Sequence, residues 1–364
     1  MAIADPAASP LLETVRATAT EFWNDSCAVA ELEYAISHGA TGATSNPSLV
    51  LDALRQEPEP WTTRLRELQA TLPTATEADL AWRIAEEMAV RGAQLLLPVF
   101  ERTSGRQGRL SIQVDPVRYR DAEGMLRQAE HLHALAPNIQ VKLPVTTAGL
   151  AAIEEATARG IHINATVNTT LAGALAVADA VERGLARRMA ASQDVAALRP
   201  VCTLMVGRLE DWLKVVCARD GILVSPGRTA WAGVAVFKRA YAIYRERGYR
   251  TRLLAGAFRS HLPWSQLIGG DIVLTIPPAW QRQLNASGME ARPRIDDPVD
   301  PAILSELLEK IPDFRCAYEP EGLASDELEG YGATVRTLRQ FIAAYHDLQA
   351  RIRDVALPDP DTKP

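Results

Sequence analysis

The residue best suited to chemistry is a lysine in the middle of an apolar segment. Residues 138–167 read as a short strand, a helix and a second strand, and Lys142 lies in the first strand. Ile139, Val141 and Leu143 share one parity, so Lys142 projects to the opposite face. Burial lowers the pKa of a lysine amine, and a neutral amine is a nucleophile toward carbonyl carbons. The alternative is a lysine at a strand end whose ammonium reaches water.

Other polar side chains stand at or just after the ends of further apolar segments. A carboxylate transfers protons, amides and hydroxyls hold sugar oxygens, and a guanidinium holds a phosphate. Each residue also has a plain structural explanation, such as a helix cap, a turn or a surface ion pair. The candidates besides Lys142 are Asp25, Thr44, Ser45, Asn46, Gln113, Asp115, Asn164, Thr166, Thr203, Arg208 and Arg259.

Composition argues against several classes of protein. The chain has 364 residues, of which 47% are hydrophobic and 23% charged, as in ordinary soluble globular proteins. Its net charge of −6 disfavours nucleic acid or an anionic membrane as a partner. Four scattered cysteines without a CxxC pair, and six histidines without HExxH, predict neither a disulfide framework nor a metal site.

The chain shows no signal for membrane insertion or export. No apolar run approaches the roughly 18 residues needed for a membrane span. Residues 1–15 lack the basic and apolar regions of a signal peptide. Together with the scattered cysteines, this predicts a cytoplasmic protein.

Eight short apolar segments alternate with helical ones. Helical periodicity fills the connections, including one long segment over residues 61–100. This alternation predicts a parallel sheet with helical crossovers, and eight units favour a closed (β/α)8 TIM barrel of the α/β class. An open doubly wound sheet is the alternative, although no GxGxxG follows the first strand. We expect strands at residues 21–26, 43–45, 108–115, 139–144, 161–167, 199–206, 252–258 and 269–278.

The last part of the chain carries no further strand pattern. Residues 287–303 read as a Pro-rich, charged surface excursion, and residues 304–311 and 325–354 as helices. We therefore expect residues 1–285 to form the barrel and residues 286–364 to form a helical extension packed on it. In such barrels chemistry gathers at the carboxyl ends of the strands, where the polar candidates would meet.

Seven strings in this order give the chain a likeness to a known family. They are GATSNPSLV, SIQVDP, IQVKLPVTTAGLAAI, GIHINATV, TLMVGRLEDW, LLAGAFR and GGDIVLTIP, and the likeness covers roughly residues 14–285. Each string is weak, but their order and spacing together are specific. The chain resembles the transaldolase family of Schiff-base aldolases.

The resemblance implies a role for each matching residue. Lys142 would be the Schiff-base lysine of the fourth strand, and Asp25 the acid/base of the first. Thr166, with Gln113, would hold the catalytic water. Sugar hydroxyls and the phosphate would be bound by Asn46, Asn164, Thr203, Arg208 and Arg259. Such chemistry requires no metal and no organic cofactor, because the imine itself stabilises the carbanion.

Several positions depart from the family pattern. Gln113 stands where transaldolases usually carry glutamate, and an amide orients a water without taking its proton. The related fructose-6-phosphate aldolases are similar in having glutamine there. Met205 replaces the usual aromatic of the sixth strand, and Ala257 replaces a serine before Arg259. The segment SHLPW at residues 260–264 is also unusual and could reshape the acceptor side.

The resemblance implies a transaldolase. Such an enzyme moves a dihydroxyacetone unit from fructose 6-phosphate or sedoheptulose 7-phosphate to an aldose phosphate. One alternative is a fructose-6-phosphate-type aldolase that releases free dihydroxyacetone. Another is a non-catalytic barrel that binds a sugar phosphate. The expected partners are phosphorylated sugars, with no nucleic acid and no membrane, and a homodimer is left open.

Overall fold

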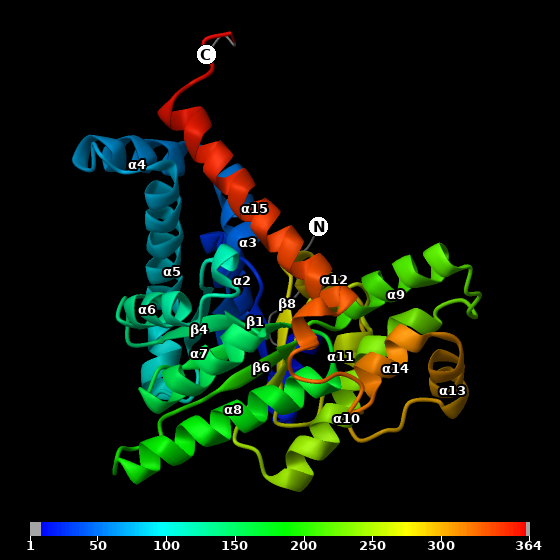
Figure 1. The fold of residues 1–364 in the computed structure, drawn as a ribbon. Helices are drawn as coiled ribbons and strands as arrows, with labels where there is room; N and C mark the ends of the chain where they lie inside the picture. Colours follow the sequence, from blue (N-terminus) through cyan, green and yellow to red (C-terminus); the bar gives the residue numbers. More distant parts are fainter. Residues whose placement is uncertain (1–8, 362–364) are drawn as a thin grey trace.

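Eight parallel strands close into a barrel in the computed structural model, which describes residues 9–361 (Figure 1). Each strand pairs with the next, and the first pairs with the last, which excludes the open doubly wound alternative. The (β/α)8 prediction is confirmed. The strands are β1 (Glu21–Asn24), β2 (Gly42–Thr44), β3 (Arg109–Gln113), β4 (Ile139–Pro144), β5 (Ile163–Asn168), β6 (Val201–Leu204), β7 (Arg252–Ala255) and β8 (Val273–Ile276).

Helices connect the strands and extend the chain beyond the barrel. The predicted absence of a signal peptide rests largely on residues that lie outside the described range. No helix in the described range is long and apolar enough to cross a membrane. The helices are α1 (Pro10–Ala17), α2 (Val29–Ser37), α3 (Pro47–Gln56), α4 (Pro58–Thr71), α5 (Glu77–Arg102), α6 (Ala122–His133), α7 (Thr147–Ala158), α8 (Leu171–Ala190), α9 (Val206–Asp220), α10 (Ala232–Arg247), α11 (Leu262–Leu267), α12 (Pro278–Ala286), α13 (Pro301–Lys310), α14 (Pro312–Tyr318) and α15 (Gly332–Ala356), with short 3-10 turns η2 (Pro116–Arg118), η3 (Arg228–Trp231) and η4 (Leu328–Gly330).

Strand parity separates the outer core from the barrel interior. On β4 the fully buried Ile139, Val141 and Leu143 join the main hydrophobic cluster with the surrounding helices, whereas Lys142 is not in it. The register aligns Lys142 with Gln113 on β3 and with Asn164 on β5. Aligned residues of neighbouring strands point to the same face, so these three side chains share the interior.

Apolar side chains from four strands fill the middle of the barrel. Trp23, Val201, Leu254 and Val273 form a separate buried cluster, and their strands β1, β6, β7 and β8 are neighbours in the closed sheet. This packing makes the interior a core and not a pore. It also separates the two ends of the barrel, so each end has its own polar side chains.

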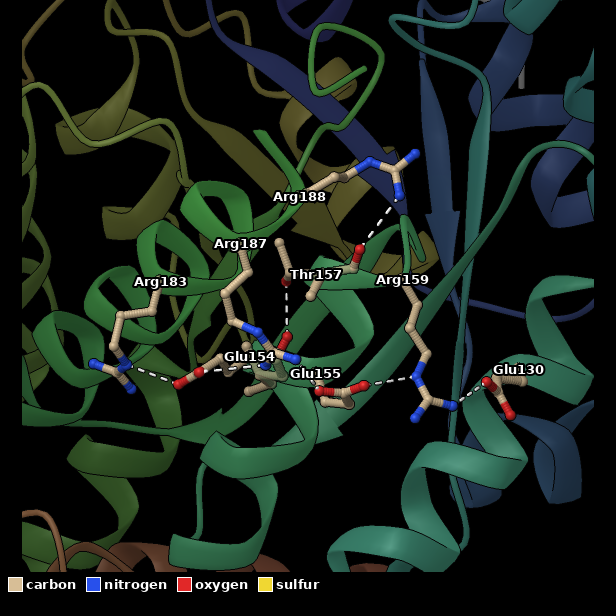
Figure 2. A network of polar contacts seen from close by, with 10 residues as sticks. Glu130, Glu154, Glu155, Thr157, Arg159, Arg183, Arg187 and Arg188 are labelled. Atoms are coloured by element: carbon tan, nitrogen blue, oxygen red, sulfur yellow. Dashed lines mark hydrogen bonds and ion pairs between the residues drawn. The ribbon is translucent and has the colours of Figure 1, made fainter. Parts of the chain in front are cut away.

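Ion pairs between helices tie part of the outer ring together (Figure 2). Glu154 on α7 pairs with Arg183 of α8 at 2.7 Å, and Glu155 pairs with Arg187 at 2.7 Å. Arg159, just after α7, bridges Glu155 and Glu130 of α6. Each of these pairs lies at the surface and contributes only about 0–1 kcal/mol, so the arrangement fixes helix register more than it adds stability.

The long helical segment expected over residues 61–100 is two helices. Pro73 cannot continue a helix, and it follows the end of α4. Thr76 then starts α5 with a capping box, in which its side chain and that of Asp79 each accept a hydrogen bond from the other residue's backbone N–H. In Figure 1 α4 projects at an angle to the upright α5.

The C-terminal helix α15 crosses the end of the barrel and packs on α3, α4 and α5 (Figure 1). Tyr345, Leu348 and Ile352 lie in one buried cluster with Trp61 and Ile84. Each fully buried side chain of this size contributes about 1.5–3 kcal/mol, so the apolar stripe accounts for the docking. At the far end of α15, Arg353 pairs with Glu77 at 2.6 Å.

Some boundaries differ from the sequence-based expectation. The eighth strand begins four residues later than expected, at Val273, and α11, α12 and α14 were not expected. The stretch 287–303 was read as a surface excursion, but Ala291 and Ile295 are buried in it and pack against the main cluster. The division of the chain into a barrel and an extension at residue 285 stays a prediction.

Candidate active site

A cavity of ≈ 700 Å³ opens at the end of the barrel where the strands finish. We call it the strand-end cavity. It contains side chains from both ends of the chain, because Phe341 of α15 forms part of its wall. Of the candidates from the sequence, Asp25, Thr44, Asn46, Lys142, Thr166, Thr203, Arg208 and Arg259 line it, whereas Ser45, Gln113, Asp115 and Asn164 do not.

Lys142 lies at the floor of this cavity. Its side chain is almost entirely removed from solvent, with 5% of the residue exposed, and Nζ donates one hydrogen bond, to the backbone oxygen of Ser45 at 3.1 Å. Burial lowers the pKa of the amine, and the nearby Asp25 carboxylate opposes that effect. The net direction favours the neutral amine, which is the nucleophilic form.

Asp25 follows β1 and accepts a hydrogen bond from one threonine hydroxyl, which a second threonine contacts in turn. Thr44 Oγ1 donates to Asp25 Oδ1 at 2.7 Å, and the hydroxyl of Thr275 lies 2.7 Å from that of Thr44. Since the single proton of Thr44 goes to the carboxylate, Thr275 is the donor to Thr44. Burial raises the pKa of Asp25, whereas the Thr44 bond and the charge of Lys142 lower it. Both members of the Asp25–Lys142 pair are therefore shifted toward their neutral forms.

Removing the Thr44 hydroxyl is expected to move the pH dependence of the site. The bond from Thr44 stabilises the charged form of Asp25, so Thr44→Val raises the pKa of that carboxyl further. If Asp25 acts as a base, the acidic limb of the kcat/KM profile shifts to higher pH by about one to two units, since a hydrogen bond to a charged group is worth about 1.5–3 kcal/mol. Thr275→Val is the matched control, because Thr275 contacts Thr44 and not the carboxylate. An equal shift in both variants, or none in Thr44→Val, would contradict this role.

A buried chain of hydrogen bonds runs between strands beside Lys142. Thr203 Oγ1 donates to Asn164 Oδ1 at 2.7 Å, and Asn164 Nδ2 donates to Ser111 Oγ at 3.2 Å. Ser111 Oγ then donates to Gln140 Oε1 at 3.0 Å. These bonds fix the orientation of the Asn164 amide. One of its two N–H groups remains for a ligand.

Gln113 lies in a neighbouring hollow of ≈ 310 Å³, which shares Asn46 with the strand-end cavity. Trp82 and Tyr345 line that hollow, and Trp82 Nε1 donates to the Tyr345 hydroxyl at 3.1 Å. Within the described residues, Gln113 Oε1 and Thr166 Oγ1 are buried without a hydrogen-bond partner. Buried polar atoms of this kind are normally satisfied by water or a ligand.

The two predicted phosphate arginines have different partners. Arg208 contacts the Gln340 side-chain oxygen of α15 and lies over the Phe341 ring at 6.0 Å, while its buried Nε has no partner among the described residues. Arg259 forms a two-point ion pair with Asp211 of α9, with its shortest distance 2.8 Å. Burial, and then repulsion from Arg259, lowers the pKa of Arg208. The positive charges of the two guanidiniums therefore repel each other.

Backbone conformations that are unfavourable for their residues flank the cavity. Val167, next to Thr166, has φ 60°, at an irregularity in the β5–β6 pairing. Ala257, two residues before Arg259, has φ 64°. Such conformations cost about 1–3 kcal/mol each and concentrate at functional sites. Gly207 permits the bend at Ala257, because a Cβ at position 207 would lie 1.9 Å from the Ala257 oxygen.

Several residues of the cavity were not predicted as site residues. Thr44 was a candidate without an assigned role, and its hydroxyl proves to contact Asp25. Thr275 occupies a position on β8 whose side chain points into the barrel, and this alternation could have identified it as a site residue. No sequence pattern identified Gln340 and Phe341 as site residues, since the pattern of an amphipathic helix does not predict contact with a distant arginine. Met205 packs with Phe341 in one small cluster, so an aromatic side chain from α15 stands beside the position where the sixth strand lacks one.

No group of three or more His, Cys, Asp or Glu side chains suited to a metal ion occurs within residues 9–361. The fold and the cavity define a (β/α)8 barrel protein with a polar site at the end where barrel enzymes carry out their chemistry.

Comparison with known proteins places this barrel in a family. The family model described as Transaldolase/Fructose-6-phosphate aldolase matches residues 22–352, and the chain belongs to that family. This confirms the resemblance seen in the sequence. A transaldolase of Thiobacillus denitrificans is 32% identical over 288 residues, which cover 72% of this chain and 79% of that protein.

Two further relatives show similar identity over shorter stretches. Transaldolase 1 of Streptomyces avermitilis is 34% identical over 230 residues, which cover 62% of this chain and 60% of that protein. A transaldolase of Mycobacterium bovis is 30% identical over 249 residues, or 66% of each chain. The match thus spans less than two thirds of the Streptomyces relative.

Proposed function

We propose that the protein is a transaldolase that transfers a dihydroxyacetone unit between phosphorylated sugars through an imine on Lys142. The observation that carries the proposal is the buried Lys142 amine beside the Asp25 carboxylate, with both pKa values shifted toward the neutral form. Membership of the family and relatives that bear the name transaldolase support the same reaction. The donors would be fructose 6-phosphate or sedoheptulose 7-phosphate.

The reaction begins with attack of the Lys142 Nζ lone pair on the C2 carbonyl of the ketose phosphate. The resulting carbinolamine takes up a proton and loses its oxygen as water, which leaves a protonated imine. A water on the Thr166 hydroxyl fits the proton transfers, because that oxygen is buried in the strand-end cavity without a partner in the described chain. Gln113 would take part through a further water, since its unpartnered oxygen lies in the neighbouring hollow.

Cleavage follows when Asp25 removes the proton of the C4 hydroxyl. The C3–C4 bond breaks, its electrons move into the imine to form an enamine, and the aldose phosphate leaves with a new carbonyl group. The enamine then adds to the aldehyde carbon of the acceptor, and Asp25 returns the proton to the new hydroxyl. Hydrolysis of the imine releases the product ketose phosphate and restores the amine.

The remaining predicted residues, in the wall or directly behind it, would bind the substrate. Asn46 Oδ1 is occupied because it caps α3 through the Leu49 N–H at 3.2 Å, so its amide N–H groups are available to sugar oxygens. Asn164 would donate its remaining N–H, and Thr203 fixes that amide. The phosphate would take the Arg208 Nε–H and share Arg259 with Asp211.

A second candidate is an aldolase that releases free dihydroxyacetone. Gln113 favours it, because an amide cannot take a proton from the water that it orients. Met205 on the sixth strand has no hydroxyl to relay a proton, which sets this candidate apart from an aldolase with a tyrosine at that position. Release of dihydroxyacetone without any aldehyde acceptor would identify the aldolase.

The direct test traps the imine. The protein is incubated with fructose 6-phosphate and sodium borohydride, digested and mapped by mass spectrometry. We expect a reduced adduct on Lys142, and its loss when the acceptor erythrose 4-phosphate removes the bound unit before the reductant is added. An adduct that appears elsewhere, or none at all, would contradict the mechanism. Binding of the sugar phosphate without an adduct would point to the non-catalytic barrel.

Two further expectations stay proposals. The thiols of Cys27, Cys202, Cys217 and Cys316 are free, which fits a cytoplasmic protein. A homodimer is testable by light scattering of the purified chain.

A further inference from the structure

The end of the barrel opposite Lys142 carries a second and larger hollow, of ≈ 970 Å³, which we call the strand-start cavity. All of its charged residues stand just before a strand or at a strand's first residue. Four are arginines and two are carboxylates, in a protein whose net charge is −6. They are Arg106, Arg199, Arg250, Arg252, Glu21 and Asp271.

Both carboxylates of this cavity are already paired with one arginine. Arg252 lies 2.9 Å from Glu21 and 2.8 Å from Asp271. Glu21 also accepts a hydrogen bond from Thr41 at 2.7 Å. Arg252 thus neutralises the negative charge of the cavity on one side.

The guanidinium groups of the other three arginines form no ion pair with a carboxylate within residues 9–361. Each guanidinium donates only to backbone oxygens: Arg106 to that of Thr103, Arg250 to that of Val195, and Arg199 to those of Ala196 and Leu198. The backbone N–H of Arg250, by contrast, donates to the Glu182 carboxylate at 3.0 Å. A guanidinium has five N–H donors, so most donors of these three groups remain available. They come from the segments before β3, β6 and β7, and so surround the cavity instead of meeting at one point.

A fifth arginine, buried behind the others, increases the positive charge. Arg109 is 4% exposed, stacks over Phe100 at 5.0 Å and donates to the Gly105 oxygen at 2.9 Å. Its Nε and NH1 are buried without partners in the described chain. Burial, and then repulsion from Arg199, lowers the pKa of Arg109 to about 10. An uncompensated buried charge is costly, and an anion bound nearby would relieve it.

We propose that the strand-start cavity binds a small anion with two or more phosphoryl groups, held by Arg106, Arg199 and Arg250. Planar guanidiniums suit phosphate oxygens, and their spread around the opening suits a ligand longer than a single phosphate. Among the described residues, Leu198 is the only large apolar side chain in the wall, so the cavity offers no platform for a base. This site is separate from the strand-end cavity, and its existence does not depend on the reaction proposed above.

The test is calorimetric titration of the intact protein with inorganic pyrophosphate, and separately with orthophosphate, at low ionic strength. We expect pyrophosphate to bind and orthophosphate to bind more weakly. Arg199→Gln combined with Arg250→Gln should weaken pyrophosphate binding about a hundredfold or more, because the double variant removes two guanidiniums that donate charge-assisted hydrogen bonds. Arg245→Gln is the matched control, because Arg245 is exposed, lies outside the cavity and pairs with Asp296.

Two further measurements distinguish binding in the strand-start cavity from binding at the opposite end of the barrel and from a purely structural role of the arginines. Arg208→Gln should keep the pyrophosphate binding. Loss of binding in this variant would place the anion in the strand-end cavity and overturn the proposal.

Without ligand, the double variant should melt at the same or a higher temperature, because it removes a charge that repels Arg109. A lower melting temperature would indicate that these arginines serve the fold alone. Should the double variant fail to fold, Arg106→Gln tests the same loss of affinity from another segment.

Discussion

Replacing Lys142 with methionine is expected to reduce kcat/KM by about 10⁴-fold or more, since loss of a covalent nucleophile costs enzymes on the order of 10⁴–10⁶ in turnover. Methionine is similar in length and cannot form an imine. The measurement is a coupled assay of aldose phosphate release from fructose 6-phosphate with an aldehyde acceptor. Lys214→Met is the matched control, because Lys214 is exposed on α9 and pairs with Glu210.

The same variant should be more stable than the wild type. Lys142 is 5% exposed and has one hydrogen bond, to a carbonyl, so burying its amine costs free energy that an apolar side chain does not. We expect a higher melting temperature together with the lost activity. A variant that is inactive and also less stable would suggest that Lys142 is mainly a structural residue, and full activity would exclude the imine.

Asp25→Asn is expected to lower kcat by about 10²–10⁴-fold, the usual contribution of a general base. The imine should still form, so borohydride should still label Lys142 in this variant. The two steps are thereby separated: nucleophilic attack survives and carbon–carbon cleavage does not. Asp52→Asn on the exposed part of α3 is the matched control and should leave kcat unchanged.

Asp25→Asn is also expected to shift the pH dependence of imine formation to lower pH. The Asp25 charge raises the pKa of the Lys142 amine, in opposition to burial. Without that charge the pKa of Lys142 falls, so imine formation should reach its maximal rate at lower pH than in the wild type. Rapid trapping of the imine across pH measures this limb. A shift to higher pH, or loss of labelling, would assign Asp25 a different role.

The barrel was predictable because its signal is local. Residues 139–144 alternate an apolar set with Gln140 and Lys142, and the strand occupies the same six residues in the structure. Asn46 caps α3 and Pro47 occupies its first turn, and both residue types are typical of helix starts. Strand ends were less predictable: β8 begins at Val273, because Gly269 takes φ 120° and the chain straightens only afterwards.

The candidate site could be predicted only as far as strand ends define it. Lys142, Asp25 and Thr166 come together because parallel strands finish at one face, a rule that needs no side-chain detail. Gln113 obeys the same rule yet lies in the next hollow, between Trp82 and Tyr345. That outcome depends on how α15 packs, and packing between distant segments leaves no pattern in the sequence. The contact of Arg208 with Gln340 was unpredictable for the same reason.

The position of α15 has a consequence for synthesis of the chain. All eight strands have been made once the ribosome has added Ile276, but Gln340 and Phe341 come later. At roughly 5–20 residues per second, the nascent barrel spends several seconds without its last helix. During that interval Val50, Leu54 and Ile84 of α3 and α5 have no partner from α15 and face water as an apolar strip. The nascent protein is therefore most exposed to chaperones and to aggregation just before its strand-end cavity is complete.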